Sequence, residues 1–334
     1  PAQIAIVRKY GSDTLNDVPS CIGVGTRLRI KARAVINTTT KTNSATGISF
    51  FGHSFLSEQG FANGVAESLG KRCYNFARGG SSSSETARVF GAVVGNYMPV
   101  GGTIPASGSV DLTPNEDAVW YAGSSLATVV LAGVQGIISS TTVSGTTTKL
   151  TFTRSTAGTA VSVPSAVPMT VLPYVRQNSW STKSLTEHST FKDDIVVIQC
   201  MRNNSSWAQG LTDVAAIVSS LGTNKFVILP EFPYATETTG TAGATTVSNY
   251  NAQLKAAYPN NYCQINGVDL LDNFKNNYNP DYAQDVTDIA NGETPSSLRY
   301  DTLHPSRYRQ ANALRSGVQV NAEFVAKFIK SKGW

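Results

Sequence analysis

The most constraining feature of this sequence is a strand-then-helix pattern that occurs on both sides of a long stretch that lacks it. The run ISFFG is short, apolar and closed by a glycine, as buried strands often are. Ala62, Val65 and Leu69 follow at helical spacing, and Gly70 stands where that helix should end. In the second half, DIVVIQ and KFVILP read as two more buried strands, each followed by a helical stripe. Strands that alternate with helices predict a parallel sheet with helices on both faces.

Three helices are expected in the second half of the chain, each from apolar residues at helical spacing. The stripes are Leu211, Val214, Ala215, Val218 and Leu221, ended by Gly222; Val247, Tyr250, Leu254 and Ala257; and Leu314, Val318, Val325, Phe328 and Ile329, in one long helix that follows Ser306. All three helices should pack on the sheet.

Residues 92–185 have a different character. Thr, Ser, Gly and Val dominate, turn residues recur at short intervals, and TKLTFTR alternates so that Leu150 and Phe152 share one face. This pattern predicts an all-β module. Because the α/β pattern resumes after it, the module interrupts one domain, which consists of residues 46–91 and 186–334.

Residues 1–45 are expected to form a separate β segment. In RLRIKARA the apolar residues face one way, and Arg27, Arg29, Lys31 and Arg33 face the other. This basic face is either solvated or meets an acidic glycan or a neighbouring subunit. The first residues lack the long apolar core of a signal peptide. The start without Met suggests either a trimmed chain or a fragment of a longer one.

The composition argues against several classes of protein. Only 15% of the 334 residues are charged, and the net charge of +5 is not gathered into a dense Lys/Arg run, so we expect no nucleic-acid partner. No window of about 18 apolar residues exists, so we expect no membrane insertion. Cys21, Cys73, Cys200 and Cys263 form no CxxC pair and histidine is scarce, so we expect neither a metal site nor a cofactor. Cys200 lies in an apolar run and is expected to be a buried free thiol.

Ser54 stands at the carboxyl end of the first predicted strand, in FFGHS. In an open α/β sheet, ligands bind outside the carboxyl ends of the strands. A serine hydroxyl becomes an effective nucleophile when a base takes its proton. DTLHPS supplies a base, His304, and an acid three residues before it, Asp301, to hold the other ring nitrogen. These three residues are the predicted catalytic triad, and His188, in a polar stretch, is expected to be a surface residue.

Four blocks of the sequence resemble, in the right order, the motifs of the SGNH (GDSL-like) hydrolase family: FFGHS, NFARGGSSS, VVIQCMRNN and DTLHPS. The resemblance covers the two α/β parts of the chain. It implies a flavodoxin-like three-layer α/β/α fold with Ser54 as the nucleophile. It also implies an oxyanion hole made of the Ser54 and Gly80 N–H groups and the Asn203 side-chain amide, with Gly79 as the alternative to Gly80.

The third and first blocks depart from the family pattern. His53 stands where the family usually has Asp, Asn204 stands in place of another usual Asp, and Met201 replaces a usual glycine, a change that can shift the loop of Asn203. We expect His53 to have a structural or substrate-contact role, the alternative being a competing base. Substrate contacts are assigned to His53, Arg202 and Asn204.

The α/β-hydrolase fold is the alternative architecture. Its nucleophile turn reads GxSxG, whereas Leu56 occupies the position of the last glycine here. That fold also places its acid and histidine on separate loops, whereas Asp301 and His304 share one. The SGNH fold is therefore preferred.

The inserted β module and the Ser/Thr/Asn/Gly-rich composition are similar to those of SGNH domains in bacteriophage tail spikes and tail fibres. This resemblance implies an esterase that removes O-acetyl groups from an acetylated bacterial polysaccharide, O-antigen or capsule, with the module holding glycan. It implies an extracellular place on the virion tail and a homotrimer through the full-length tail spike. Two alternatives stay open: a secreted bacterial carbohydrate or lipid esterase, and a glycan-binding adhesin with a degenerate site.

Overall fold

The fold is known from a computed structural model, which describes residues 47–114, 127–143, 147–172, 194–204 and 206–334. The β segment expected over residues 1–45, with its basic face, lies outside the described residues, as do His188 and Cys21. Residues 45–334 form one unit.

A four-stranded parallel sheet forms the centre of the α/β part. Its strands are β1 (Ile48–Gly52), β2 (Cys73–Asn75), β11 (Ile195–Gln199) and β12 (Phe226–Ile228), in the order β12-β11-β1-β2. All neighbours run parallel. The prediction of a mixed α/β chain with a parallel sheet is therefore confirmed.

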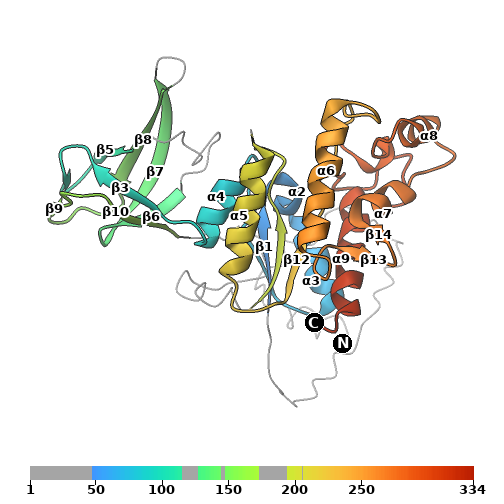
Figure 1. The fold of residues 1–334 in the computed structure, drawn as a ribbon, viewed down its shortest axis with the longest axis horizontal. Coiled ribbons are helices and arrows are strands. Elements are labelled where there is room, and N and C mark those ends of the chain that lie inside the picture. Colours follow the sequence, from blue (N-terminus) through green and yellow to red (C-terminus); the bar gives the residue numbers. More distant parts are fainter. Residues whose placement is uncertain (1–46, 115–126, 144–146, 173–193, 205) are drawn as a thin grey trace, which may run out of the picture. The chain divides into compact units, whose positions relative to one another are not determined.

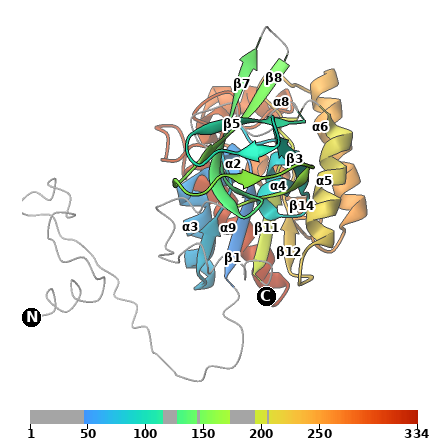
Figure 2. The ribbon, with the colours of Figure 1, turned by 90° about the vertical axis from the view of Figure 1, so that its left-hand side faces the viewer.

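Helices cover both faces of the sheet, and successive residues of β1 point to opposite faces. Ile48 and Phe50 belong to one buried cluster and Phe51 to another. The first cluster is shared with α2 (Ser54–Ser57), α3 (Gln59–Leu69), α7 (Leu270–Asn276) and α9 (Gly317–Ser331). The second is shared with α4 (Ser83–Phe90), α5 (Trp207–Ser219) and α6 (Ala242–Ala257). Figure 2 shows α3 and α9 on one side of the strands and α5 and α6 on the other.

The strand order creates a switch point between β1 and β11. From β1 the chain moves outward to the edge strand β2, and it later returns to the other side of β1 to form β11 and then β12 (Figure 1). At such a point the connections leave in opposite directions, and open α/β sheets usually bind their ligands at the carboxyl ends of the strands there. The predicted nucleophile and the predicted Asn203 loop follow the two strands on either side of this point.

Two helix predictions need correction. Leu314 was expected on the face of the last helix but is 78% exposed, because α9 begins only at Gly317, where the Ser316 hydroxyl accepts the Gln319 N–H at 3.2 Å. Helix α5 ends at Ser219, whereas Gly222 was predicted to end it. Its buried residues include Val214 and Ile217, whereas Ala215 faces solvent. Elsewhere Gly70 ends α3 in the left-handed conformation, as predicted.

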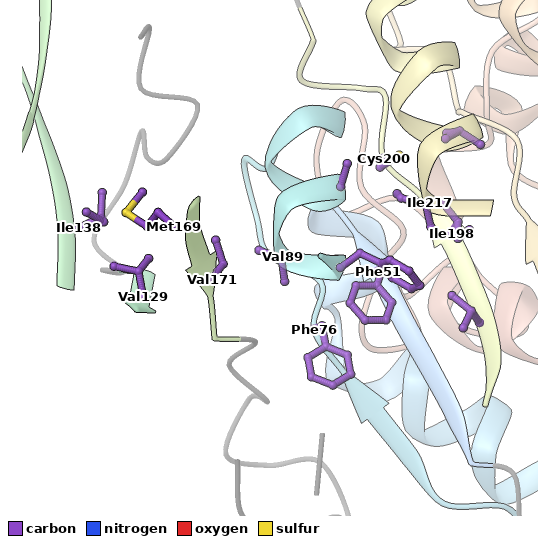
Figure 3. Close-up of a cluster of buried hydrophobic side chains, with 14 of the residues drawn as sticks. Phe51, Phe76, Val89, Val129, Ile138, Met169, Val171, Ile198, Cys200 and Ile217 are labelled. Atoms are coloured by element: carbon purple, nitrogen blue, oxygen red, sulfur yellow. The ribbon is translucent and has the colours of Figure 1, made fainter. Parts of the chain in front are cut away.

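The inserted stretch contains a closed barrel of six antiparallel strands. They are β3 (Gly95–Pro99), β5 (Ser109–Thr113), β6 (Ala127–Leu131), β7 (Val134–Val143), β8 (Thr147–Arg154) and β10 (Val167–Val171), and the strands β4 (Thr103–Ile104) and β9 (Val161–Ser162) pair separately. Leu150 and Phe152 are both buried, as their alternation predicted. Figure 3 shows side chains of this barrel, including Ile138 and Met169, and side chains of the α/β layer, including Phe51 and Ile198. The prediction of an all-β module is confirmed, while its exact limits stay a prediction.

The remaining elements lead toward the predicted base. A hairpin of β13 (Gln264–Ile265) and β14 (Val268–Asp269) precedes α7, and α8 (Ala283–Ala290) and the short 3-10 helix η3 (Ser296–Leu298) follow it. Cys73, Cys200 and Cys263 are buried, and Cys200 is a free thiol, as predicted. None of the helices that the structure describes is both long enough and apolar enough to cross a membrane.

Candidate active site

Ser54 begins the short helix α2 directly after β1. At the end of β1, a Cβ on Gly52 would lie 1.8 Å from the carbonyl oxygen of Gln199, so only glycine allows β1 and β11 to approach this closely. The His53 N–H donates to the same carbonyl at 3.1 Å. The nucleophile loop is therefore fixed against the end of β11.

The His304 ring links Ser54 to Asp301. Its Nε2 lies 2.7 Å from Ser54 Oγ, and its Nδ1 lies 2.7 Å from Asp301 Oδ2. An ionised Asp301 accepts the proton on Nδ1, which leaves Nε2 free to accept the serine proton. Ser54 and His304 are 250 positions apart in the sequence, and the fold brings them together with Asp301, as predicted.

The carboxyl of Asp301 is held in its ionised form. Burial raises its pKa, but the N–H groups of His304 and Leu303 and the His304 ring outweigh this effect, so that its pKa lies below the ordinary value. The two N–H groups donate to Asp301 Oδ1 at 2.7 and 2.8 Å, which leaves Oδ2 for the ring. Asp301 can therefore orient the base at neutral pH.

A short turn presents the base. The Tyr300 N–H donates to the His304 carbonyl at 3.1 Å. Arg299 and Pro305, which flank the turn, pair with each other in an antiparallel β-bridge. Behind this turn, the buried carboxyl of Asp285 accepts the N–H of Ser297 at 2.8 Å. The bonds limit the conformational freedom of the segment that carries the base.

Two aromatic rings contact the imidazole of His304. Tyr300 is stacked on it, with ring centroids 5.4 Å apart and planes at 19°. Phe55, which follows the nucleophile, lies 5.5 Å from it at 37°. Arg307, three residues after the base, pairs with Glu58, four residues after the nucleophile, through Nε at 2.5 Å and Nη2 at 2.8 Å.

Of the loops predicted to form the oxyanion hole, the one that carries Gly79 and Gly80 approaches Ser54. A Cβ on Gly79 would lie 4.0 Å from the Ser54 Cβ, and Gly80 has φ of 81°, a conformation that favours glycine. The Asn203 side-chain amide donates to the Ser81 carbonyl at 3.0 Å, which ties the third block to the second. An amide carries two N–H groups, so this bond leaves one for another acceptor. Their role as oxyanion donors stays a prediction.

Met201 is accommodated without exposure to solvent. It is fully buried, and a Cβ on Gly210 of α5 would lie 1.4 Å from its Sδ. Gly210 therefore provides the space that the Met201 side chain occupies.

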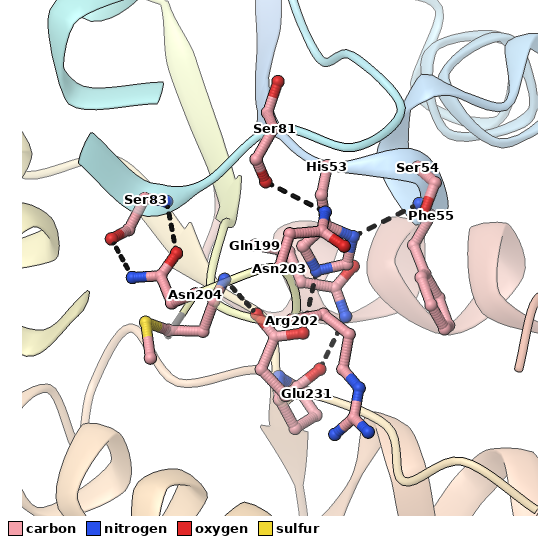
Figure 4. Close-up of polar contacts among 12 residues, drawn as sticks. His53, Ser54, Phe55, Ser81, Ser83, Gln199, Arg202, Asn203, Asn204 and Glu231 are labelled. Carbon is pink, nitrogen blue, oxygen red and sulfur yellow. Dashed lines mark hydrogen bonds and ion pairs between the residues drawn. The ribbon is translucent and has the colours of Figure 1, made fainter. Parts of the chain in front are cut away.

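His53 is fully buried and points into the protein. Its Nε2 lies 2.8 Å from Glu231 Oε2, and its Nδ1 accepts the Phe55 N–H at 3.4 Å (Figure 4). The other carboxyl oxygen of Glu231 accepts the Met201 N–H at 2.7 Å. Both ring nitrogens are thus engaged away from Ser54 Oγ, which favours the structural interpretation of His53 over a competing base or a substrate contact.

Arg202 also has protein partners. Its guanidinium donates to Glu237 Oε2 at 2.5 Å and lies 4.0 Å from the ring centre of Tyr234. Because its side chain is buried, the substrate contact assigned to Arg202 has no support in this geometry.

Asn204 links the third block to helix α4. Its Oδ1 accepts the Ser83 N–H at 2.7 Å, and its Nδ2 donates to Ser83 Oγ. The Ser83 hydroxyl in turn donates to Asp213 Oδ2 at 2.6 Å. These bonds indicate that Asn204 braces the loop of Asn203.

Glu231 was missed by the sequence reasoning. It stands just beyond β12, at the same edge of the sheet as Ser54 and Asn203. The sequence feature that could have identified Glu231 is its place directly after the apolar run KFVILP. Over the described ranges, no three His, Cys, Asp or Glu residues gather in a way that could hold a metal ion.

The sequence of the chain is similar to that of a phage tail spike protein. No family model matches it. Over 294 residues, 87% of the chain, it is 47% identical to the tail spike protein of Salmonella phage epsilon15. The match covers 27% of that protein, so the chain spans about a quarter of the length of this relative. The chain is homologous to part of a tail spike protein.

Proposed function

We propose that the chain is a serine esterase of the SGNH type, with the flavodoxin-like three-layer fold that the strand order β12-β11-β1-β2 supports. The observation that carries the proposal is the hydrogen-bonded series of Ser54 Oγ, the His304 ring and Asp301, with both distances at 2.7 Å. A site that had lost its activity would be under no requirement to keep this series, which argues against an adhesin with a degenerate site.

The proposed reaction begins with attack of Ser54 Oγ on the acetyl carbonyl carbon, while His304 Nε2 takes the serine proton. The carbonyl oxygen becomes an oxyanion, stabilised by the N–H groups of Ser54 and Gly80 and by the Asn203 amide. The bond from the carbonyl carbon to the alcohol oxygen then breaks, and that oxygen takes the proton from Nε2. Water attacks the acetyl-Ser54 ester in the same way, and acetate leaves as Ser54 regains its proton.

The proposed substrate is an O-acetylated bacterial surface polysaccharide, an O-antigen or capsule. The relative is a tail spike protein, and its name places it on a phage of Salmonella. We extend this to an extracellular place on the virion tail, a homotrimer through the full-length protein, and a glycan-holding role for the barrel. A secreted bacterial esterase is less well supported, because the homologous protein belongs to a virus.

The test is release of acetate from p-nitrophenyl acetate and from O-acetylated polysaccharide by the wild type and Ser54→Ala. The variant should lose at least about a hundredfold in kcat on both substrates, because the loss of a triad nucleophile costs far more than tenfold. Ser68→Ala, which changes an exposed serine on α3, is the matched control and should be as active as the wild type. Wild-type protein with no activity on either substrate would refute the proposal.

A further inference from the structure

A cavity of about 510 Å³ lies between helices α6 and α7, and none of the three predicted triad residues lines it. Its wall is made by residues of both helices, of the β13–β14 hairpin, of the loop over residues 233–240 and of the turn at Gly292. Pockets for small ligands usually measure about 300–1,000 Å³. The α6–α7 cavity is therefore large enough to hold a small organic ligand.

The charged side chains that line the α6–α7 cavity balance each other. Lys255 and Lys275 supply two positive charges, and Asp269 and Asp272 supply two negative charges. The remaining acid, Glu237, already forms an ion pair of 2.5 Å with a buried arginine. A small anion would be repelled by the carboxylates and a small cation by the ammonium groups, so this balance favours a neutral ligand.

Hydrogen bonds within the protein hold the polar groups of Lys275 and Asp269 in place. Lys275 Nζ donates to the Gly292 carbonyl at 2.6 Å, which leaves two of its three N–H groups for another acceptor. Burial lowers the pKa of Lys275, while the charges of Asp272 and Asp269 oppose this effect. Asp269 accepts the Tyr262 hydroxyl at 3.2 Å and the Asp272 N–H at 2.9 Å. Groups that are fixed in this way lose little conformational entropy when a ligand binds.

The α6 side of the cavity carries short side chains. Ala244, Ser248 and Ala252 are four residues apart, which places them on one face of the helix. The Ser248 hydroxyl and the Asn249 amide, which also line the cavity, can each donate and accept hydrogen bonds. An apolar ligand would leave these groups without partners, which is costly, whereas a ligand rich in hydroxyl groups would pair with them.

The loop over residues 233–240 connects the α6–α7 cavity to the turn that carries the predicted base. The Ala235 N–H donates to the Thr302 carbonyl at 2.8 Å, two residues before His304. Glu237, two residues after Ala235, lines the cavity. Because two residues span at most about 7 Å, this path places the Cα atoms of Glu237 and His304 within about 20 Å of each other. A polymer of several sugar units can therefore reach both places.

We propose that the α6–α7 cavity is a second, non-catalytic site for polysaccharide, which binds neutral sugar units of the same polymer whose acetyl ester reaches Ser54. This inference rests on the proposed polysaccharide substrate and adds a site that holds the polymer during the reaction. Sugar hydroxyl groups both donate and accept hydrogen bonds, which matches the mixed donors and acceptors of the lining. Because no triad residue lines the cavity, the site should affect affinity for polymer and leave the chemical step unchanged.

The experiment fills the cavity from its α6 side. Ala252→Trp and Ser248→Trp place a large side chain at exposed positions of the helix, so the fold should be kept. For the O-acetylated polysaccharide that the wild type hydrolyses best among purified O-antigens and capsules, each variant should raise KM at least about tenfold at unchanged kcat. Both kinetic constants for p-nitrophenyl acetate should stay as in the wild type. Gln253→Trp, at an exposed α6 position outside the cavity lining, is the matched control and should leave both substrates unaffected.

Direct binding separates this site from the catalytic one. Ser54→Ala should bind the polysaccharide nearly as tightly after mild alkali has removed its acetyl groups, because the cavity is expected to contact sugar and not the ester. Adding Ala252→Trp to this variant should weaken binding of both forms about tenfold, which calorimetric titration measures.

Three outcomes would overturn the second site. An unchanged KM for polymer in both cavity variants would mean that the polymer does not enter the cavity. An equal loss on polymer and on p-nitrophenyl acetate would mean that the new side chains disturb the catalytic turn. A loss of the same size in Gln253→Trp would show a general effect of bulk on α6. Failure of the wild type to hydrolyse either substrate is a separate result, because it would refute the esterase proposal while the titration still measures binding in the cavity.

Discussion

His53 Nε2 lies 2.8 Å from Glu231 Oε2, and the two side chains are 0% and 1% exposed. Because Nδ1 accepts the Phe55 N–H, the ring proton belongs on Nε2 and is donated to the carboxylate. The same carboxylate accepts the Met201 N–H through its other oxygen. One buried acid therefore joins the residue before the nucleophile to the loop that carries Asn203.

Glu231→Gln should destabilise the protein and lower its activity. The amide has a single acceptor oxygen, so either the Met201 N–H or His53 Nε2 loses its partner. Breaking a buried pair costs about 3 kcal/mol, which corresponds to about 4–5 °C in the thermal midpoint of a chain of this size. Calorimetry and kcat on p-nitrophenyl acetate measure the two effects. Glu67→Gln, an exposed acid on α3, is the control, and an effect of equal size there would count against the interpretation.

The contact between Met201 and Gly210 predicts strong coupling in a double-mutant cycle. Gly210→Ala alone should destabilise the protein, because the new Cβ would lie 1.4 Å from Met201 Sδ. After Met201→Ala the same change fills vacated space and removes a helix-interior glycine, which is worth about 1 kcal/mol in a helix. Chemical denaturation of the four proteins gives the coupling free energy. Additive effects would show that the loop moves aside instead.

The arrangement of Ser54, Asp301 and His304 could be anticipated from sequence because strand ends and motif order limit where each residue lies. The parallel sheet follows from apolar runs that alternate with helical stripes. The direction of the His53 side chain could not be read in this way, since its partner Glu231 lies 178 positions away and only the folded sheet brings them together. Leu314 was misplaced for a related reason: spacing alone does not tell where a helix begins, and the Ser316 cap decides it.

The directions of the side chains around Asn203 were the least predictable part of the site. Arg202 and Asn204 stand beside Asn203 in sequence, but one lies against Tyr234 and Glu237 and the other is bonded to Ser83. Adjacent residues of a loop point in different directions, and hydrogen bonds with distant segments determine which of them reach solvent. Tyr300 was not identified from the sequence, because its position directly before Asp301 gives no sign that its ring stacks on the His304 ring.

Glu85 of α4 should make stability depend on pH. Burial raises the pKa of this carboxyl to about 7 from 4.5, against the opposing effects of Arg78, Ser81 and Ser82. Between these two values the native state holds a proton that the unfolded state has lost, so stability should fall as pH rises from about 4.5 to 7 and then level off. Glu85→Gln mimics the protonated form. Its stability relative to the wild type should therefore increase across this range by up to about 3 kcal/mol. Urea denaturation at several pH values measures this difference, and a difference that stays constant would contradict it.

Asn203→Ala should reduce kcat about 100- to 1,000-fold on p-nitrophenyl acetate while KM changes little, because an oxyanion donor acts in the transition state. The amide uses one N–H for the Ser81 carbonyl and has a second one for the oxyanion. Asn203→Asp keeps the size of the side chain and removes both donors, so its kcat should fall at least as far.

Asn204→Ala separates this role from loop support. Its bonds run to Ser83, so its loss should mainly lower the thermal midpoint and affect kcat much less. If Asn203→Ala lowers the midpoint and leaves kcat unchanged, the amide only fastens the loop to Ser81. The oxyanion would then have to be stabilised by backbone N–H groups alone, those of Ser54 and of the Gly79–Gly80 turn. Steady-state kinetics at saturating substrate, paired with calorimetry on each variant, distinguishes the two roles.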